Sequence, residues 1–152
     1  MALFNLRVYG ILLDNQNRLL VSDEFIRGNY ITKLPGGGLE IGEGTRECLV
    51  REFMEETGLT VKVGEHIYTT DFFQISAFNN VDQIISIYYW VHCDDYSTLN
   101  TSEKPFDFLP EQVADITACA ESFRWISLEQ LSADDMTLPI DKVAISILKK
   151  IQ

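Results

Sequence analysis

A proline followed by three glycines, and then by a helix-forming stretch, sets the main limit on how this chain folds. Residues 31–34 favour a short strand, which Pro35 and the three glycines bring to an end. Residues 45–57 predict a helix, and Gly58 stands at the position where helices commonly end. Strand-forming segments lie on both sides, so we expect one central helix flanked by strands.

The rest of the chain alternates strand-forming segments with loops and closes on a second helix. Apolar residues that recur at helical spacing after Pro139 predict that last helix. Strands around one helix, with another helix at the end, indicate a single domain over residues 1–152 of the α/β or α+β class. The other expected elements are a β-hairpin over residues 6–22, a loop over 22–30, long strands over 60–75 and 83–93, an acidic loop over 94–121 and a short strand over 123–126.

The acidic composition argues against several classes of partner. The chain has 152 residues, with 12 Lys and Arg against 23 Asp and Glu, which gives a formal net charge of −11. Such a surface repels nucleic-acid backbones and anionic lipids, so we expect no nucleic-acid polymer as a partner. No apolar run approaches the ~20 residues that a membrane-spanning helix needs. Residues 1–7 also lack the pattern of a secretory leader. We therefore expect a soluble, cytoplasmic protein that makes no membrane contact.

The three cysteines, Cys48, Cys93 and Cys119, are odd in number and widely spaced. No pair forms a CxxC motif, and neither histidine lies at a metal-ligand spacing from them. We interpret them as buried thiols of a protein from a reducing compartment.

Carboxylates are concentrated in residues 40–56. This window of 17 residues holds six glutamates, whereas the chain average of 23 acids in 152 residues predicts between two and three. On a helix, Glu52, Glu55 and Glu56 fall within one arc, where like charges repel. A divalent cation would remove that repulsion, and Mg²⁺ prefers carboxylate and phosphate oxygens. The alternative interpretation is a solvated helix face with ordinary ion pairs.

The surroundings of these glutamates favour the metal interpretation. Arg51 lies one turn from a glutamate on either side and would hold a carboxylate in place. Directly upstream, Gly36, Gly37 and Gly38 let the backbone approach a metal or a phosphate without an intervening side chain. The opposite arc of the helix is apolar and would anchor it to a sheet through Leu49, Val50, Phe53 and Met54.

The segment from Gly37 to Leu59 resembles the Nudix box, G-x5-E-x7-R-E-U-x-E-E-x-G-U, in which U is a bulky apolar residue. No defined position departs from the pattern. The resemblance implies the Nudix fold, a mixed β-sheet sandwiched between α-helices, and a MutT-like protein. The residues at the defined positions are Gly37, Glu43, Arg51, Glu52, Phe53, Glu55, Glu56, Gly58 and Leu59.

The same resemblance implies Mg²⁺-dependent hydrolysis of a nucleoside diphosphate linked to another group, with Mn²⁺ as an alternative metal. In that family, water attacks a phosphorus of the pyrophosphate bridge. Glu55 and Glu56 would be the main metal ligands, and Glu52 would be a further ligand or the base that activates the water. The carbonyl of Gly36 would complete the coordination, and Arg51 would orient the glutamates.

Several further residues are candidates for supporting roles. Glu43 would be a supporting carboxylate within the box. Arg27, in the loop before the glycines, would meet a phosphate, with a plain surface arginine as the alternative. Rivals to Glu52 as the base are Glu121, Glu103 and Glu111, for which the alternative is an exposed loop acid.

The sequence leaves the substrate open. Markers of the ADP-ribose, NADH and coenzyme A branches of the family are missing, and the next proline after Pro35 is Pro105. A nucleoside triphosphate or a nucleotide sugar therefore remains. The alternatives to a hydrolase are a non-catalytic Nudix module that senses a nucleotide metabolite, an isomerase of the isopentenyl diphosphate type and a structural domain. Dimerisation is common in the family, so a homodimer is an option that the residues do not decide.

Overall fold

The computed structural model describes residues 1–151, and in it the first strand is paired along both edges. Strand β1 (Phe4–Leu12) lies between β4 (Gly36–Gly38), which is antiparallel to it, and β6 (Gln83–His92), which is parallel. Strand β5 (Lys62–Thr69) pairs antiparallel with β6. The resulting mixed sheet has the order β4-β1-β6-β5, so the three glycines of β4 form an edge.

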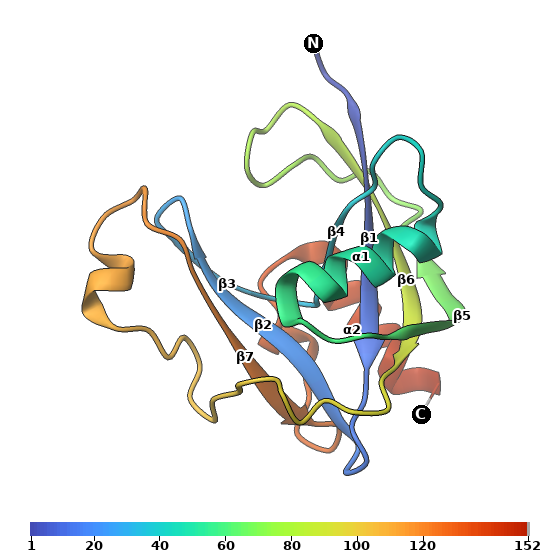
Figure 1. Ribbon diagram of the computed structural model, residues 1–152. Helices are drawn as coiled ribbons and strands as arrows, with labels where there is room; N and C mark the ends of the chain where they lie inside the picture. Colours follow the sequence, from blue (N-terminus) through green and yellow to red (C-terminus); the bar gives the residue numbers. More distant parts are fainter. Residues whose placement is uncertain (152) are drawn as a thin grey trace. The chain divides into compact units, whose positions relative to one another are not determined.

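Helix α1 (Thr45–Thr57) crosses β4 and β1 (Figure 1). A Cβ on Gly10 of β1 would lie 2.6 Å from the ring of Phe53, so only a glycine there lets the helix approach this closely. The helix ends at Gly58, whose φ of 74° is left-handed and whose N–H donates to the Met54 carbonyl at 3.0 Å. The expected helix over residues 45–57 is confirmed.

The buried face of α1 differs in part from the expected apolar arc. Its buried residues are Cys48, Leu49 and Phe53. Val50 and Met54 are exposed instead, by 39% and 47%. The helix is therefore anchored along a narrower stripe, which the thiol of Cys48 completes.

A second sheet has the order β3-β2-β7 and is antiparallel throughout. Helix α2 (Pro139–Ile151) closes the chain as expected and buries an apolar face that includes Ile140, Ala144 and Leu148. The strands and short 3₁₀ helices of this part are β2 (Arg18–Ile26), β3 (Asn29–Lys33), β7 (Ala120–Ser127), η1 (Pro110–Val113) and η2 (Ala133–Asp135).

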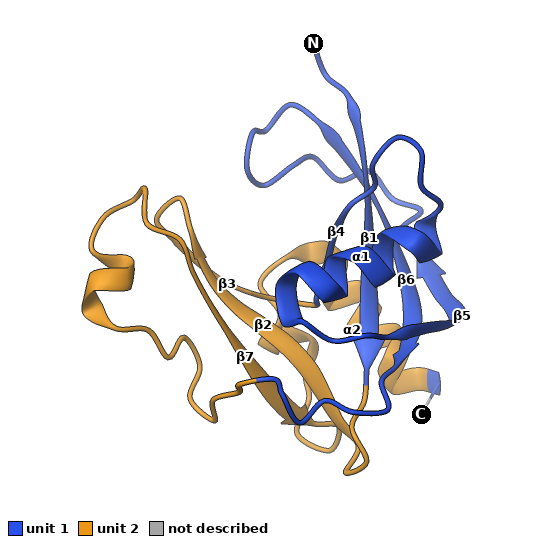
Figure 2. Cartoon of the chain, in the orientation of Figure 1, with its two compact units in different colours: residues 1–12, 35–99, 151–152 blue, residues 13–34, 100–150 orange. Residues whose placement is uncertain are grey.

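The two sheets belong to two compact units (Figure 2). Unit 1 comprises residues 1–12, residues 35–99 and Ile151, and it contains the first sheet and α1. Unit 2 comprises residues 13–34 and 100–150 and contains the second sheet with nearly all of α2. The expected α+β class with a mixed sheet is confirmed, with the strands divided between two sheets. Within residues 1–151, no helix has the length and apolar character needed to cross a membrane.

Two expectations for the N-terminal part were wrong. Residues 6–22 do not form the expected hairpin of two paired strands, because β1 and β2 belong to different sheets; an isolated antiparallel bridge joins Leu13 to Leu19 in the turn between them. The expected loop over residues 22–30 is instead the end of β2 and the start of β3, joined by a tight turn at Arg27 and Gly28, with φ angles of 51° and 79°. The sequence of β2 looks like a loop because it contains buried polar residues. One of them, Asp23, accepts hydrogen bonds from Arg124 at 2.6 and 3.0 Å.

Other boundaries shift by a few residues. The strand expected over residues 60–75 ends at Thr69, and the one expected over 83–93 ends at His92. The last strand begins at Ala120, so it takes the end of the expected acidic loop, and that loop also contains η1.

Candidate metal and phosphate site

Arg51 is the centre of a network of carboxylates on α1 and the segment before it. Its Nε donates to Glu43 Oε2 at 3.0 Å, and its Nη2 donates to Glu43 Oε1 at 2.6 Å. This two-pronged contact is the strongest geometry for a guanidinium and a carboxylate. Its Nη1 donates to Glu52 Oε1 at 2.9 Å and to Glu55 Oε2 at 3.2 Å. The predicted orienting role of Arg51 thus has a geometric basis.

The charge of Arg51 fixes the protonation state of its main partner. The hydrogen bond from Arg51 lowers the pKa of Glu43 to about 2, despite the opposing effect of burial. The carboxylate of Glu43 also accepts from the backbone N–H of Glu40 at 2.9 Å. The pKa of Arg51 is raised in turn by the hydrogen bond to Glu43, so the pair stays charged at neutral pH.

Glu52 lies directly against the glycine strand. A Cβ built on Gly37 would be 2.5 Å from Glu52 Cδ and 2.6 Å from both carboxylate oxygens. The space that a side chain would fill at residue 37 is therefore taken by the carboxylate. Because the side chain of Glu52 is only 14% exposed, the position of its carboxylate is well defined.

The edge strand β4 presents backbone oxygens on the same side. The N–H of Gly10 donates to the Pro35 carbonyl at 2.9 Å. In an antiparallel pair of strands, every second residue forms no hydrogen bond with its partner strand, and this bond sets Gly36 and Gly38 at those positions of the pairing with β1. Their polar backbone groups consequently turn away from β1. The Gly38 carbonyl accepts from Arg51 Nη2 at 3.0 Å, and the carbonyl of Gly36 shares its direction.

The chemistry of these groups fits a hard divalent cation. The carboxylates of Glu52 and Glu55 both accept a hydrogen bond from Nη1 of Arg51, so they lie close together. Carboxylate and carbonyl oxygens are the ligands that Mg²⁺ prefers. Glu55 is the more accessible of the two, with its side chain 58% exposed. Within residues 1–151, however, no three His, Cys, Asp or Glu side chains converge on one point. The ligand set of Glu52, Glu55, Glu56 and Gly36 therefore remains a prediction.

The other predicted site residues lie in unit 2 and are described there. Arg27 occupies the exposed turn between β2 and β3. Glu103 and Glu111 are exposed in the long loop, as the alternative interpretation expected. Glu121 is different, because its carboxyl end accepts a hydrogen bond from Ser22 at 3.2 Å. Burial of that end and the neighbouring Glu24 raise the pKa of Glu121.

The three cysteines differ in how far they are buried. Cys48 is buried as predicted, and burial together with Glu43 raises the pKa of its thiol to about 12. Cys93 is half-buried, and Cys119 is exposed, so the prediction of burial was wrong for Cys119. Cys119 lies in the irregular segment before β7, which leaves it open to solvent.

One residue of this region was missed in the sequence. Arg7 of β1 lies opposite Gly38 of β4 in the sheet register. Its Nε donates to the hydroxyl of Tyr9 at 2.6 Å. Burial opposes the charged form, but Tyr9, Glu52 and Glu56 outweigh that effect and raise the pKa of Arg7. The signal in the sequence was a lone charged residue, Arg7, in a strand-forming segment.

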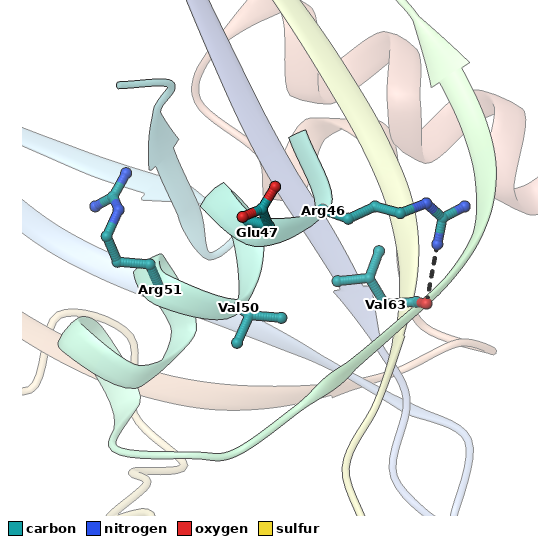
Figure 3. A pocket seen from close by; sticks show the side chains of 5 residues that line it. All are labelled: Arg46, Glu47, Val50, Arg51 and Val63. Atoms are coloured by element: carbon teal, nitrogen blue, oxygen red, sulfur yellow. Dashed lines mark hydrogen bonds between the residues drawn. The ribbon is translucent and has the colours of Figure 1, made fainter. Parts of the chain in front are cut away.

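A shallow depression of about 440 Å³ lies beside α1 (Figure 3). The side chain of Arg46 extends toward β5 and donates to the Val63 carbonyl at 3.0 Å, while the side chain of Arg51 points away from that contact. The depression includes none of the three predicted carboxylate ligands. It is lined by Arg46, Glu47, Val50, Arg51 and Val63.

Comparisons with known proteins identify the family and the fold. The family model described as NUDIX domain matches residues 3–146. The fold is similar to that of a NUDIX hydrolase from Nitrosomonas europaea, with a TM-score of 0.69 and 17% identity over 96% of this chain and 88% of that one. The fold is also similar to that of a MutT protein from Methanosarcina mazei Go1, with a TM-score of 0.66 and 19% identity over 99% of this chain and 97% of that one. An ADP-ribose pyrophosphatase from Streptococcus suis is similar as well, with a TM-score of 0.60 and 13% identity over 97% of this chain and 90% of that one.

The family model matches nearly the whole chain, and the fold is that of the same family. The chain belongs to the Nudix family.

Proposed function

We propose that this protein hydrolyses the pyrophosphate linkage of a nucleoside diphosphate joined to another group, with Mg²⁺ as its cofactor. The observation that carries the proposal is the set of carboxylates gathered by Arg51 beside a strand of glycines. Carboxylates ordered by one guanidinium, next to a backbone that leaves room for a phosphate, suit metal-assisted phosphoryl chemistry. Nucleoside triphosphates and nucleotide sugars are the substrate classes that the sequence leaves open.

Glu52, Glu55, Glu56 and the carbonyl of Gly36 would hold the metal. When bound, Mg²⁺ neutralises charge on the phosphates and lowers the pKa of a coordinated water. Mn²⁺, which also accepts oxygen ligands, would substitute for it. Arg51 keeps two of the glutamates in place by donating one hydrogen bond to each.

Glu52 is also the proposed base that takes a proton from the attacking water. Arg51 contacts Oε1 of Glu52, whereas Oε2 receives no hydrogen bond from any residue of the described chain. An ionised oxygen in that position accepts a proton from a water within hydrogen-bond reach. Glu121, Glu103 and Glu111 remain rival bases.

The proposal includes where the substrate binds and where the enzyme works. The backbone of Gly37 and Gly38 would contact the phosphates, and a phosphate contact by Arg27 of unit 2 stays a prediction. We propose a small-molecule nucleotide as the partner, because a net charge of −11 disfavours a nucleic-acid polymer. A cytoplasmic enzyme with one Nudix domain over residues 1–152, as a monomer or a homodimer, completes the proposal.

A phosphate-release screen tests the proposed function. It would cover nucleoside triphosphates, ADP-ribose, nucleotide sugars and dinucleoside polyphosphates, with Mg²⁺ and with a chelator. We expect turnover of one class that requires the metal and falls about a hundredfold or more in Glu56→Gln. Glu65→Gln, at an exposed carboxylate of β5, is the matched control and should keep full turnover. Nucleotide binding without turnover of any substrate would favour the sensor instead, and metal-independent turnover would contradict the proposed mechanism.

A further inference from the structure

Arg7 has a rigid anchor inside the first sheet. The hydroxyl that accepts from its Nε belongs to Tyr9, which is only 2% exposed. The ring of Tyr9 stacks on that of Tyr88, with centroids 5.6 Å apart. Because the Tyr9 hydroxyl cannot move far, the guanidinium of Arg7 is held in one place. The side chain therefore loses little conformational entropy when a ligand binds.

The guanidinium of Arg7 is directed toward the glycine edge of the sheet. Residues directly opposite each other in a sheet share a face, so Arg7 and Gly38 lie on the same one. The Nη1 atom is 3.7 Å from the position that a Cβ on Gly38 would occupy. Since Gly38 has no side chain, nothing at that residue covers the guanidinium.

The terminal nitrogens of Arg7 are uncommitted. In the described chain, the only hydrogen bond of its side chain is the one from Nε to Tyr9, and it forms no ion pair. Glu52 and Glu56 act on its charge from a distance, and both raise its pKa. Among the described residues, the guanidinium of Arg7 forms no hydrogen bond with Glu52 or Glu56, so its four remaining N–H groups are available to another acceptor.

The other arginines of unit 1 are already engaged by the protein. Arg51 uses all three of its nitrogens on carboxylates and a carbonyl. Arg46 donates to the carbonyls of Val63 and Gly64 and lies over the ring of Tyr89. Of the three, Arg7 is therefore the one suited to an external anion.

We propose that Arg7 binds the diphosphate of the substrate, with its two terminal nitrogens donating to non-bridging phosphate oxygens. This inference rests on the proposed function. The planar guanidinium matches a phosphate through two parallel hydrogen bonds. Arg7 and Gly38 lie on the sheet face opposite to Gly37 and Glu52, so the diphosphate would reach both groups around the β4 edge, where a divalent cation would screen its charge from the carboxylates.

Calorimetric binding of two non-hydrolysable probes, methylenediphosphonate and α,β-methylene-ADP, tests this role in the presence of Mg²⁺. Arg7→Met should weaken both probes about ten- to a hundredfold, because a charge-assisted contact is lost while the stem is kept. Arg7→Lys keeps the charge without the fork, so its loss should be intermediate. Arg46→Ala is the matched control and should bind as the wild type does.

The outcomes separate this inference from the proposed function. Wild-type binding that Arg7→Met and Arg7→Lys leave unchanged would overturn the role of Arg7 alone. No binding of either probe by the wild type would overturn the proposed function and the role of Arg7 together. If Arg7→Met is poorly folded by circular dichroism, Arg7→Lys decides, and a lysine variant equal to the wild type rejects the two-pronged contact.

Discussion

At the scale of single residues, the site depends on what is missing from Gly37 as much as on the carboxylates. The carboxylate of Glu52 occupies the volume of a side chain at residue 37. The φ of Gly37 lies outside the left-handed region, so its role is to leave space and not to permit an unusual backbone. The glycine and the glutamate thus form a steric pair, in addition to their roles in the family pattern.

Gly37→Ala should therefore damage activity more than stability. The new methyl group would push away the Glu52 carboxylate, which is the far end of a flexible side chain. We expect a loss in kcat/KM of about tenfold or more, with a change in unfolding free energy of about 1 kcal/mol or less. Steady-state kinetics and urea unfolding of the same variant measure both.

Gly38→Ala is the steric control for that substitution. The nearest atom to its added Cβ is Arg7 Nη1 at 3.7 Å, an ordinary contact. Its loss of activity should be clearly smaller than that of Gly37→Ala. Equal losses in the two variants, with unchanged binding of the diphosphate probes by Gly38→Ala, would show that Glu52 is not held against residue 37.

At the scale of elements, helix α1 and the segment before it act together through Glu43 and Arg51. The helix could be predicted from local signals alone: helical spacing, a glycine at its end and a glycine run before it. Strand β2 could not, because its buried Asp23 is paired with Arg124, 101 residues away. Polar residues that are satisfied only by a distant partner look like a loop in the sequence.

The contact between Glu43 and Arg51 predicts a specific pH dependence of stability. The pKa of Glu43 is about 2 in the folded protein, against an ordinary value of 4.5. The contact therefore stabilises the fold fully above pH 4.5, and its contribution is lost as the pH falls toward 2. Urea unfolding of the wild type between pH 6 and about 2 should show this decline.

Glu43→Gln should flatten that decline. The variant has no carboxylate at residue 43 to take up a proton, so its free energy of unfolding should change less over the same range of pH. Glu65→Gln serves as the control and should follow the wild type. Parallel curves for Glu43→Gln and the wild type would mean that Arg51 does not hold Glu43 in solution.

At the scale of the whole molecule, the family match over residues 3–146 takes in segments of both compact units. The Nudix box is one continuous segment that lies entirely within unit 1. Its candidate site residues could therefore be predicted from their spacing in the sequence. The placement of Arg7 beside the glycine strand depends on the pairing of β1 with β4, which joins Arg7 to Gly38, 31 residues further along the chain. The charged residue was visible in the sequence, but its partner strand was not, so the place of Arg7 beside the site emerged only from the structure.

Metal binding by the carboxylate face of α1 is the central claim, and Mn²⁺ titration followed by electron paramagnetic resonance tests it most directly. The wild type should bind Mn²⁺, and Mg²⁺ should displace it. The double variant Glu55→Gln/Glu56→Gln should bind at least about tenfold more weakly, while Glu65→Gln binds as the wild type does. Absence of Mn²⁺ binding in the wild type, or equal affinity in the double variant, would contradict the account.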